Sequence, residues 1–139
     1  MKKKASAIWN GTGKEGKGTL STQSGVLTNS QYSFKTRFED GIGTNPEELI
    51  AAAHAGCFSM KLSFNISGEG LTPESIETTA HVNLNPDKGE IDTIHLEVTV
   101  KAPGLTQEKF DALVEDAKTN CPVSKVLNAE ISIESQLLQ

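Results

Sequence analysis

Two cysteines, Cys57 and Cys121, are the side chains of this 139-residue chain best suited to redox chemistry. A thiolate is a strong nucleophile, and two thiols that meet can be oxidised to a disulfide and reduced again. An unreactive cysteine, by contrast, simply packs as a small apolar side chain. Considered alone, two cysteines favour this plainer role. The residues around each cysteine must therefore show whether it is reactive or merely packed.

The position of Cys57 predicts little activation by its own helix. It lies eleven positions after Pro46, where a helix is expected to begin, and so about 16 Å from the helix start. The positive end of the helix dipole acts mainly in the first turn and cannot lower the pKa of this thiol much. A reactive Cys57 therefore needs a cation from another part of the protein. Cys121 differs, because a short helix is expected to begin directly beside it.

Arg37 is the only arginine among 13 basic side chains. Its planar, permanently charged guanidinium has the geometry to hold a thiolate and a carboxylate together. Glu47 is the candidate carboxylate. Both residues also have plainer interpretations: a solvated surface charge for Arg37, and favourable electrostatics at a helix N-terminus for Glu47.

The three histidines show no spacing typical of a metal site. His54 lies three residues before Cys57, so the two are neighbours on the expected helix, and a Cys–His pair could activate a thiolate. A histidine among alanines in a helix is also typical of a packed, hydrogen-bonded residue. His81 and His95 fall on the polar faces of expected strands and are predicted to be exposed.

A glycine-rich run, Gly11 to Lys17, matches G-x-G-x-x-G and most of a phosphate-binding loop. A dinucleotide site needs a helix after the third glycine, but the following residues have a strand pattern. A phosphate loop needs Ser or Thr after its lysine, and Gly18 stands there. The run is interpreted as a strand connection.

Composition argues against several classes of protein. The net charge is −5, the sequence pI is about 5.2, and the only basic run is Lys2-Lys3-Lys4, which argues against nucleic-acid binding. No apolar stretch approaches the roughly 18 residues of a membrane span. The apolar run after the lysines is too short for a signal-peptide core, so we expect a cytoplasmic protein with reduced cysteines.

Hydropathy patterns in the first part of the chain predict strands. Short strands are expected over residues 5–9 and 19–22. From Tyr32 to Glu39, apolar and polar residues alternate, which predicts a half-buried strand with Arg37 on its polar face.

A long helix follows. Asn45 is a suitable cap, Pro46 suits the first helical position, and Glu48 occupies the capping-box position. The helix is expected to continue to about residue 65. Small side chains at its centre predict burial on all sides and close approach of another element.

The second half of the chain predicts a hairpin, two helices and a last strand. Strands separated by helices, with no linker or repeat, indicate one α+β domain over residues 1–139 with a mainly antiparallel sheet. The expected elements are strands over 76–84 and 94–100, a helix capped by Thr106, a short helix over 122–128 and a strand over 131–133.

These segments resemble the osmotically induced protein C family, OsmC, which is related to the organic hydroperoxide resistance proteins, Ohr. The resemblance covers almost the whole chain, and the two cysteine segments together are highly specific. The matching segments are Gly16-Lys17-Gly18-Thr19, Ser24-Gly25-Val26-Leu27, Thr36-Arg37-Phe38-Glu39, residues 43–60, residues 121–127 and residues 129–131.

The resemblance implies a thiol peroxidase that acts on organic hydroperoxides and, less well, on hydrogen peroxide. Cys57 matches the peroxidatic cysteine and Cys121 the resolving one, so a Cys57–Cys121 disulfide is expected during turnover. Arg37 matches the arginine that OsmC members supply from this segment, and Glu47 matches the glutamate that orients it. Ohr members use an arginine nearer the N-terminus, where this chain has only lysines, which favours the OsmC branch.

The same resemblance implies an intertwined homodimer with active sites at the subunit interface. Each subunit would be α+β, with a mainly antiparallel six-stranded sheet and a buried central helix. The implied reductant is a dithiol, such as the dihydrolipoyl group of a lipoylated protein, and no metal or other cofactor is implied. An apolar pocket around Cys57, lined by Phe58, Met60 and Ile50, would suit alkyl or lipid peroxides. The expected role is defence against oxidative and osmotic stress.

Two other functions stay open. The same fold could be a non-catalytic module that binds a small apolar or thiol-reactive ligand, or a structural dimer with inert thiols. The second cysteine, together with Arg37 and Glu47, argues against the binding module, because such a module has no use for a resolving thiol.

Overall fold

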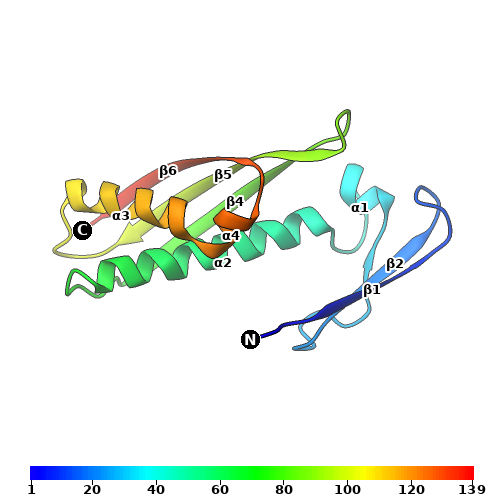
Figure 1. Cartoon of the computed structure of the whole chain (residues 1–139), viewed down its shortest axis with the longest axis horizontal. Coiled ribbons are helices and arrows are strands. Elements are labelled where there is room, and N and C mark those ends of the chain that lie inside the picture. Colours follow the sequence, from blue (N-terminus) through cyan, green and yellow to red (C-terminus); the bar gives the residue numbers. More distant parts are fainter. The chain divides into compact units, whose positions relative to one another are not determined.

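A computed structural model describes residues 1–139 and shows an α+β chain (Figure 1). The chain forms two compact units, residues 1–49 and residues 50–139. Each unit has its own three-stranded sheet, and the single six-stranded sheet that the family resemblance implies is not formed within the chain. The two sets of strands are separated along the sequence by a helix of 22 residues, and each set forms its hydrogen-bonded ladder only within itself.

The first unit is built on an antiparallel sheet of three strands, β1 (Ala5–Asn10), β2 (Lys17–Thr22) and β3 (Ser30–Tyr32). The glycine-rich run joins β1 to β2, which confirms that it is a strand connection. Gly18 lies between the rings of Trp9 and Tyr32, whose centroids are 5.3 Å apart. A Cβ at this position would meet both rings, so glycine is required for the aromatic pair to form.

The segment after β3 is a short helix, α1 (Phe34–Phe38), and the prediction of a strand here is wrong. Thr36 N–H donates to Oγ of Ser33 at 3.3 Å, and Ser33 N–H donates to Oγ1 of Thr36 at 2.9 Å. This reciprocal capping box satisfies two backbone donors locally and favours the helix over the strand. Phe34 and Phe38, four residues apart, stack with their centroids at 4.7 Å. Arg37 therefore lies on a helix.

The long helix α2 (Pro46–Ser67) begins as predicted. Oδ1 of Asn45 accepts a hydrogen bond from Glu48 N–H at 2.7 Å, which confirms Asn45 as the cap. The sequence predicts a capping-box bond for the Glu48 carboxylate. This carboxylate instead accepts a hydrogen bond from the Thr44 hydroxyl at 2.7 Å. Gly43 has a φ of 121°, and a Cβ there would meet the Gln31 carbonyl. This turn allows Thr44 N–H to donate to that carbonyl at 2.8 Å, which fixes the start of α2 beside β3.

The second unit is built on the strands β4 (Ser75–Asn85), β5 (Glu90–Lys101) and β6 (Glu130–Leu138). β4 and β5 form the predicted antiparallel hairpin, and β6 pairs with β5 in parallel. Since the other strand pairs of the chain are antiparallel, the fold is mainly antiparallel, as predicted. A parallel pair needs a crossover. The helices α3 (Gln107–Asn120), capped by Thr106 as predicted, and α4 (Pro122–Val126) provide it.

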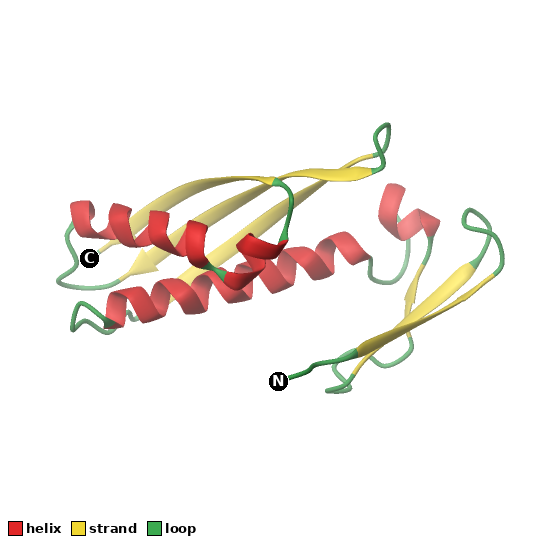
Figure 2. Cartoon of the chain, in the orientation of Figure 1, coloured by secondary structure: helices red, strands yellow, loops and turns green.

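The core of the second unit lies between its helices and one face of its sheet (Figure 2). α2 contributes residues at four-residue spacing, and β5 contributes alternate residues, as the two periodicities require. The buried apolar residues are Phe58, Leu62, Ile66, Ile94, Leu96, Val98, Val100, Ala102, Leu105, Phe110, Val114, Ala117 and Cys121. Cys121 is thus a core residue, placed where α3 ends and α4 begins.

α2 is buried along one side and open on the other, so the prediction of burial on all sides is wrong for the single chain. His54, Phe58 and Leu62 are fully buried. Gly56 is exposed, and Met60 and Phe64 are 65% and 69% exposed. The small residues at the centre of α2 thus form an apolar face that the chain itself does not cover. No helix of the structure combines the length and apolar character needed to span a membrane.

Candidate active site

Cys57 and Cys121 meet in the second unit. Cys57 lies on α2 and is half-buried, while Cys121 immediately precedes α4 and is fully buried. Both the Cys121 side chain and the backbone N–H of Val123 lie close enough to the Cys57 sulfur to shift its pKa. Both cysteines are free thiols. A Cys57 sulfur that becomes oxidised therefore has a second thiol in contact with it.

The immediate surroundings of Cys57 favour the thiol over the thiolate. Burial raises the pKa of Cys57, and the neighbouring Cys121 side chain raises that pKa further. The nearby backbone N–H of Val123 acts in the opposite direction. Since the thiolate is the nucleophile, these contacts alone leave Cys57 poorly reactive. The sequence-based expectation that Cys57 needs a cation from elsewhere agrees with this environment.

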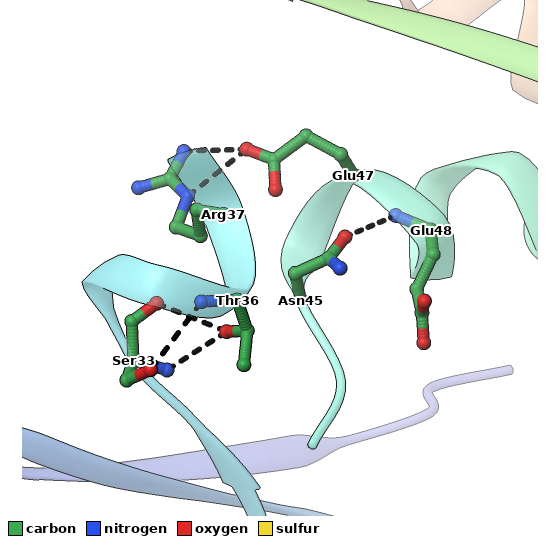
Figure 3. Close-up of polar contacts among 6 residues, drawn as sticks. All are labelled: Ser33, Thr36, Arg37, Asn45, Glu47 and Glu48. Carbon is green, nitrogen blue, oxygen red and sulfur yellow. Dashed lines mark hydrogen bonds and ion pairs between the residues drawn. The ribbon is translucent and has the colours of Figure 1, made fainter. Parts of the chain in front are cut away.

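The first unit holds a cation in a fixed position. Nε and Nη2 of Arg37 donate to one oxygen, Oε1 of Glu47, at 2.9 and 2.7 Å (Figure 3). Glu47 is 8% exposed, whereas the Arg37 side chain is 38% exposed. The other carboxylate oxygen, Oε2, is buried and accepts no hydrogen bond. Glu47 thus orients the guanidinium, and Nη1 stays available for another acceptor.

Aromatic side chains border Arg37 in the first unit. A cavity of about 250 Å³ is lined by Arg37 together with Trp9, Tyr32, Phe34 and Phe38, among others. The guanidinium carbon of Arg37 lies 5.4 Å from the centroid of the Phe38 ring, within the range of a cation–π contact. Apolar walls beside a cation suit a small molecule with an apolar body and a polar head.

His54 lies one turn before Cys57 on α2 and is fully buried. Its Nε2 forms a hydrogen bond of 2.7 Å with the hydroxyl of Ser124 on α4, and its Nδ1 has no partner. Burial lowers the pKa of His54, so the imidazole is neutral at neutral pH. The structure confirms the interpretation of His54 as a packed, hydrogen-bonded residue, because a neutral ring already bonded to Ser124 is not the cation that Cys57 needs.

The other two histidines lie on the outer face of the second sheet; His81 is exposed, as predicted, whereas His95 is half-buried. Nε2 of His81 is 3.3 Å from Glu97, and Nδ1 of His95 forms a hydrogen bond of 2.7 Å with Ser132. His95, Glu97 and Glu134 offer ligand atoms within 4.8 Å of one another, a grouping that the linear spacing of the histidines does not indicate. These side chains are exposed or half-buried.

The predicted lining of a pocket around Cys57 is only partly realised. Ile50 is partly buried and packs against the core, and Met60 is largely exposed. Phe58 is fully buried in the core and lines no open surface, so the prediction is wrong for this residue. The reason is helical geometry, because Phe58 shares the buried side of α2 with His54.

The four residues predicted to form the site come together as two pairs, Cys57 with Cys121 and Arg37 with Glu47. Each pair lies within one unit of the chain. The sequence reasoning missed the hydroxyl of Ser124 and the N–H of Val123. A backbone donor leaves no mark in a sequence, and the only signal for Ser124 is its place in the short segment that begins at Cys121.

Comparison with known proteins relates this arrangement to a family. A family model described as OsmC-like protein matches residues 39–136. Peroxiredoxin OsmC of Escherichia coli (strain K12) is 53% identical over 137 residues, which cover 97% of this chain and 96% of that protein. Organic hydroperoxide resistance protein OhrA of Bacillus subtilis (strain 168) is 32% identical over 97 residues, 69% of this chain and 68% of that protein.

The fold comparison agrees. The crystal structure of the organic hydroperoxide resistance protein OhrB of Bacillus subtilis matches with a TM-score of 0.64 and 25% identity. The match covers 95% of this chain and 97% of that one. Because the family match spans most of the sequence and the similarity to Peroxiredoxin OsmC runs almost from end to end, this chain belongs to the OsmC-like protein family.

Proposed function

We propose that this chain, a thiol-dependent peroxidase, reduces organic hydroperoxides to alcohols at the sulfur of Cys57. The thiolate attacks one peroxide oxygen, the O–O bond breaks, and the alkoxide takes up a proton and leaves as an alcohol. The peroxide gains two electrons, and Cys57 becomes a sulfenic acid. Hydrogen peroxide is the poorer substrate, since it has no organic group for aromatic walls such as those beside Arg37 to bind.

Cys121 then resolves the oxidised site. Its thiol attacks the sulfenic sulfur of Cys57, and the Cys57–Cys121 disulfide forms with loss of water. The observation that supports this proposal is the proximity of the two free thiols, since Cys121 lies close enough to Cys57 to raise its pKa. A dithiol, such as the dihydrolipoyl group of a lipoylated protein, restores both thiols by exchange and leaves as its own cyclic disulfide. This cycle requires a reducing compartment, which we take to be the cytoplasm.

Arg37 supplies the charge that Cys57 lacks. Its guanidinium stabilises the Cys57 thiolate through the donor that Glu47 leaves free, and Glu47 keeps the fork in orientation. This assignment rests on two facts: the contacts of Cys57 favour its neutral form, and Arg37 is held by two hydrogen bonds from one side only. The arginine fork suits a thiolate and a carboxylate at the same time.

The functional protein in this proposal is an intertwined homodimer, in which residues 1–139 act as one domain and strands of both chains complete six-stranded sheets. The open face of α2 supports the dimer, because Gly56, Met60 and Phe64 on it are exposed. A Cβ added at Gly56 would have no neighbour within 4 Å, so the chain itself gives no steric reason for glycine there. A second α2 approaching this face would give that reason.

The names of the relatives support the substrate class and the physiological role. One is named a peroxiredoxin, and another is named for resistance to organic hydroperoxides. The role proposed for this chain, in line with its family resemblance, is defence against oxidative and osmotic stress.

The test is a thiol titration before and after one equivalent of cumene hydroperoxide. The peroxidase loses two thiols per chain, and peptide mass spectrometry finds the disulfide between Cys57 and Cys121. A binding module, or a structural dimer with inert thiols, loses none. Loss of thiols into disulfides between chains would contradict the role of Cys121 as the resolving cysteine of its own chain.

A further inference from the structure

Two side-chain contacts join α2 to the segment that carries Cys121, and they are in register. One is the approach of Cys121 to Cys57, close enough to raise the Cys57 pKa, and the other is the hydrogen bond of 2.7 Å between His54 and Ser124. His54 lies three residues before Cys57, and Ser124 lies three residues after Cys121. Residues three apart on a helix lie on the same side, so the two contacts lie one turn apart along the same helix–helix contact.

Few other polar interactions fix the position of the segment that carries Cys121. α4 is only five residues long, and the Cys121 side chain makes no capping hydrogen bond to it. Cys121 N–H continues the α3 ladder by donating to Ala117 at 2.9 Å, which fixes the segment at its beginning. Further along, the polar side-chain anchor to α2 is the bond from Ser124, and both of its partners are nine-tenths or more buried.

We propose that His54 is a positioning residue for disulfide formation, which holds α4 through Ser124 so that the Cys121 thiol meets the sulfur of Cys57. This inference rests on the proposed function and deepens it. His54 takes no part in the attack on the peroxide. It acts on the second step, in which the Cys121 thiol displaces hydroxide from the Cys57 sulfenic acid and water is released.

The geometry separates this role from that of a catalytic base. Nε2 of His54 is engaged with Ser124, and neither ring nitrogen forms a hydrogen bond with Cys57 or Cys121. The ring is fully buried and neutral, and its other nitrogen has no partner in the chain. A base would change the rate of the first step and its dependence on pH, whereas a positioning residue changes the condensation alone.

The experiment measures the two steps separately. The reduced protein is mixed with cumene hydroperoxide, quenched at intervals with an alkylating agent, and resolved by mass spectrometry into free thiol, dimedone-trapped sulfenic acid and disulfide. In Ser124→Ala and His54→Ala, we expect loss of the Cys57 thiol at the wild-type rate. Disulfide formation should be at least about tenfold slower, which corresponds to about 1.4 kcal/mol in the barrier, and sulfenic acid should accumulate.

Two further variants make the test specific. Ser124→Thr keeps the hydroxyl and should restore the condensation rate. Ser59→Ala is the matched control, because Ser59 also lies on α2 and its hydroxyl also forms a 2.7 Å hydrogen bond, in this case with Thr78 of β4. It should condense at the wild-type rate. Ser124→Ala removes a single oxygen atom, so it decides the question even if His54→Ala fails to fold.

The inference is overturned if Ser124→Ala forms the disulfide as fast as the wild type. It is also overturned if the loss of the Cys57 thiol slows as much as the condensation, because His54 and Ser124 would then act on Cys57 itself. If the wild-type protein forms no disulfide, the proposed function fails and this inference falls with it. A wild type that forms the disulfide, with variants that do so equally fast, contradicts only the positioning role.

Discussion

Removal of the Arg37 guanidinium should have two measurable consequences, one for stability and one for Cys57. The stability effect follows from the two hydrogen bonds that reach Oε1 of Glu47 at 2.9 and 2.7 Å. A hydrogen bond to a charged group contributes about 1.5–3 kcal/mol, and breaking a fully buried ion pair costs about 3–5 kcal/mol. Because the Arg37 side chain is 38% exposed, solvent screens the pair, and we expect Arg37→Ala to cost about 1.5–3 kcal/mol.

The second consequence of removing the Arg37 guanidinium is a higher pKa of the Cys57 thiol. An opposite charge within about 4–6 Å lowers a pKa by about 1–3 units. The contacts of Cys57 within its own unit raise its pKa, so removing the cation should return the thiol toward or above the free value of about 8.5. The thiolate fraction at pH 7 then falls, and the peroxidase rate falls with it. Arg37→Lys keeps the charge but loses the fork, so it should be impaired less than Arg37→Ala.

The assay is the pH dependence of Cys57 alkylation, followed at the Cys57 peptide, together with urea unfolding and steady-state rates with tert-butyl hydroperoxide. Glu47→Gln is the matched variant, because it leaves the cation in place and alters only its orientation. It should weaken turnover less than Arg37→Ala. An unchanged alkylation profile in Arg37→Ala would falsify the activation of Cys57 by this arginine. A loss of stability below about 0.5 kcal/mol would show that the ion pair is solvated like an ordinary surface pair.

Four further outcomes are expected. Cys57→Ser should abolish turnover with its fold intact, because a hydroxyl is far less nucleophilic than a thiolate, and appreciable peroxidase activity would refute its role. Cys121→Ser should react once and then stall or over-oxidise, so intact mass should show added oxygen in place of a disulfide; normal turnover with a lipoyl reductant would make the second cysteine dispensable. The wild type should be a homodimer by light scattering at micromolar concentration, and Gly56→Leu should shift it toward monomer, whereas an active wild-type monomer would exclude the interface site. Burial lowers the pKa of His54, so its contribution to the free energy of unfolding is present above about pH 6.5 and is lost as the pH falls. The free energy of unfolding of His54→Gln, measured with urea at pH 7.5 and at pH 5, should therefore fall less between these two pH values than that of the wild type.

Local signals in the sequence account for much of the fold. The start of α2 was predictable because Asn45 and Pro46 act on backbone groups within one turn, and the cap is formed by the side chain expected to form it. The β4–β5 hairpin was predictable because alternation with period two and a polar turn are both local features. The same holds for Thr106 and α3.

The strand predicted from Tyr32 to Glu39 shows where local patterns become ambiguous. Aromatic residues at positions 34 and 38 fit one face of a strand and also one side of a helix, since both periods place them together. The capping box between Ser33 and Thr36 decides for the helix, and its bonds outweigh the alternation over so short a segment.

Sheet membership and the site contacts depend on distant residues, and no local pattern contains them. The parallel pairing of β6 with β5 joins residues on either side of α3 and α4, so it is set by long-range contacts. Cys57 was a candidate from its residue type and was assigned as the peroxidatic cysteine from the family resemblance, whereas its approach to Cys121 and Val123 depends on how α4 packs against α2. Ser124 is a further case, because a serine in a short helix has no distinctive spacing until a buried histidine is found opposite it.

The chemistry of the chain is divided in a way that explains why assembly and activity should be linked. The unit that carries Cys57 and Cys121 favours the neutral form of the Cys57 thiol, because burial and the neighbouring Cys121 side chain raise its pKa. The unit that carries Arg37 stabilises a cation, because a buried carboxylate pairs with it. Neither set of contacts alone produces a nucleophile. If a dimer brings the guanidinium to the sulfur, then Cys57 of the free chain reacts poorly with peroxides. The attacking thiolate then forms only where the resolving thiol and the orienting glutamate are also in place.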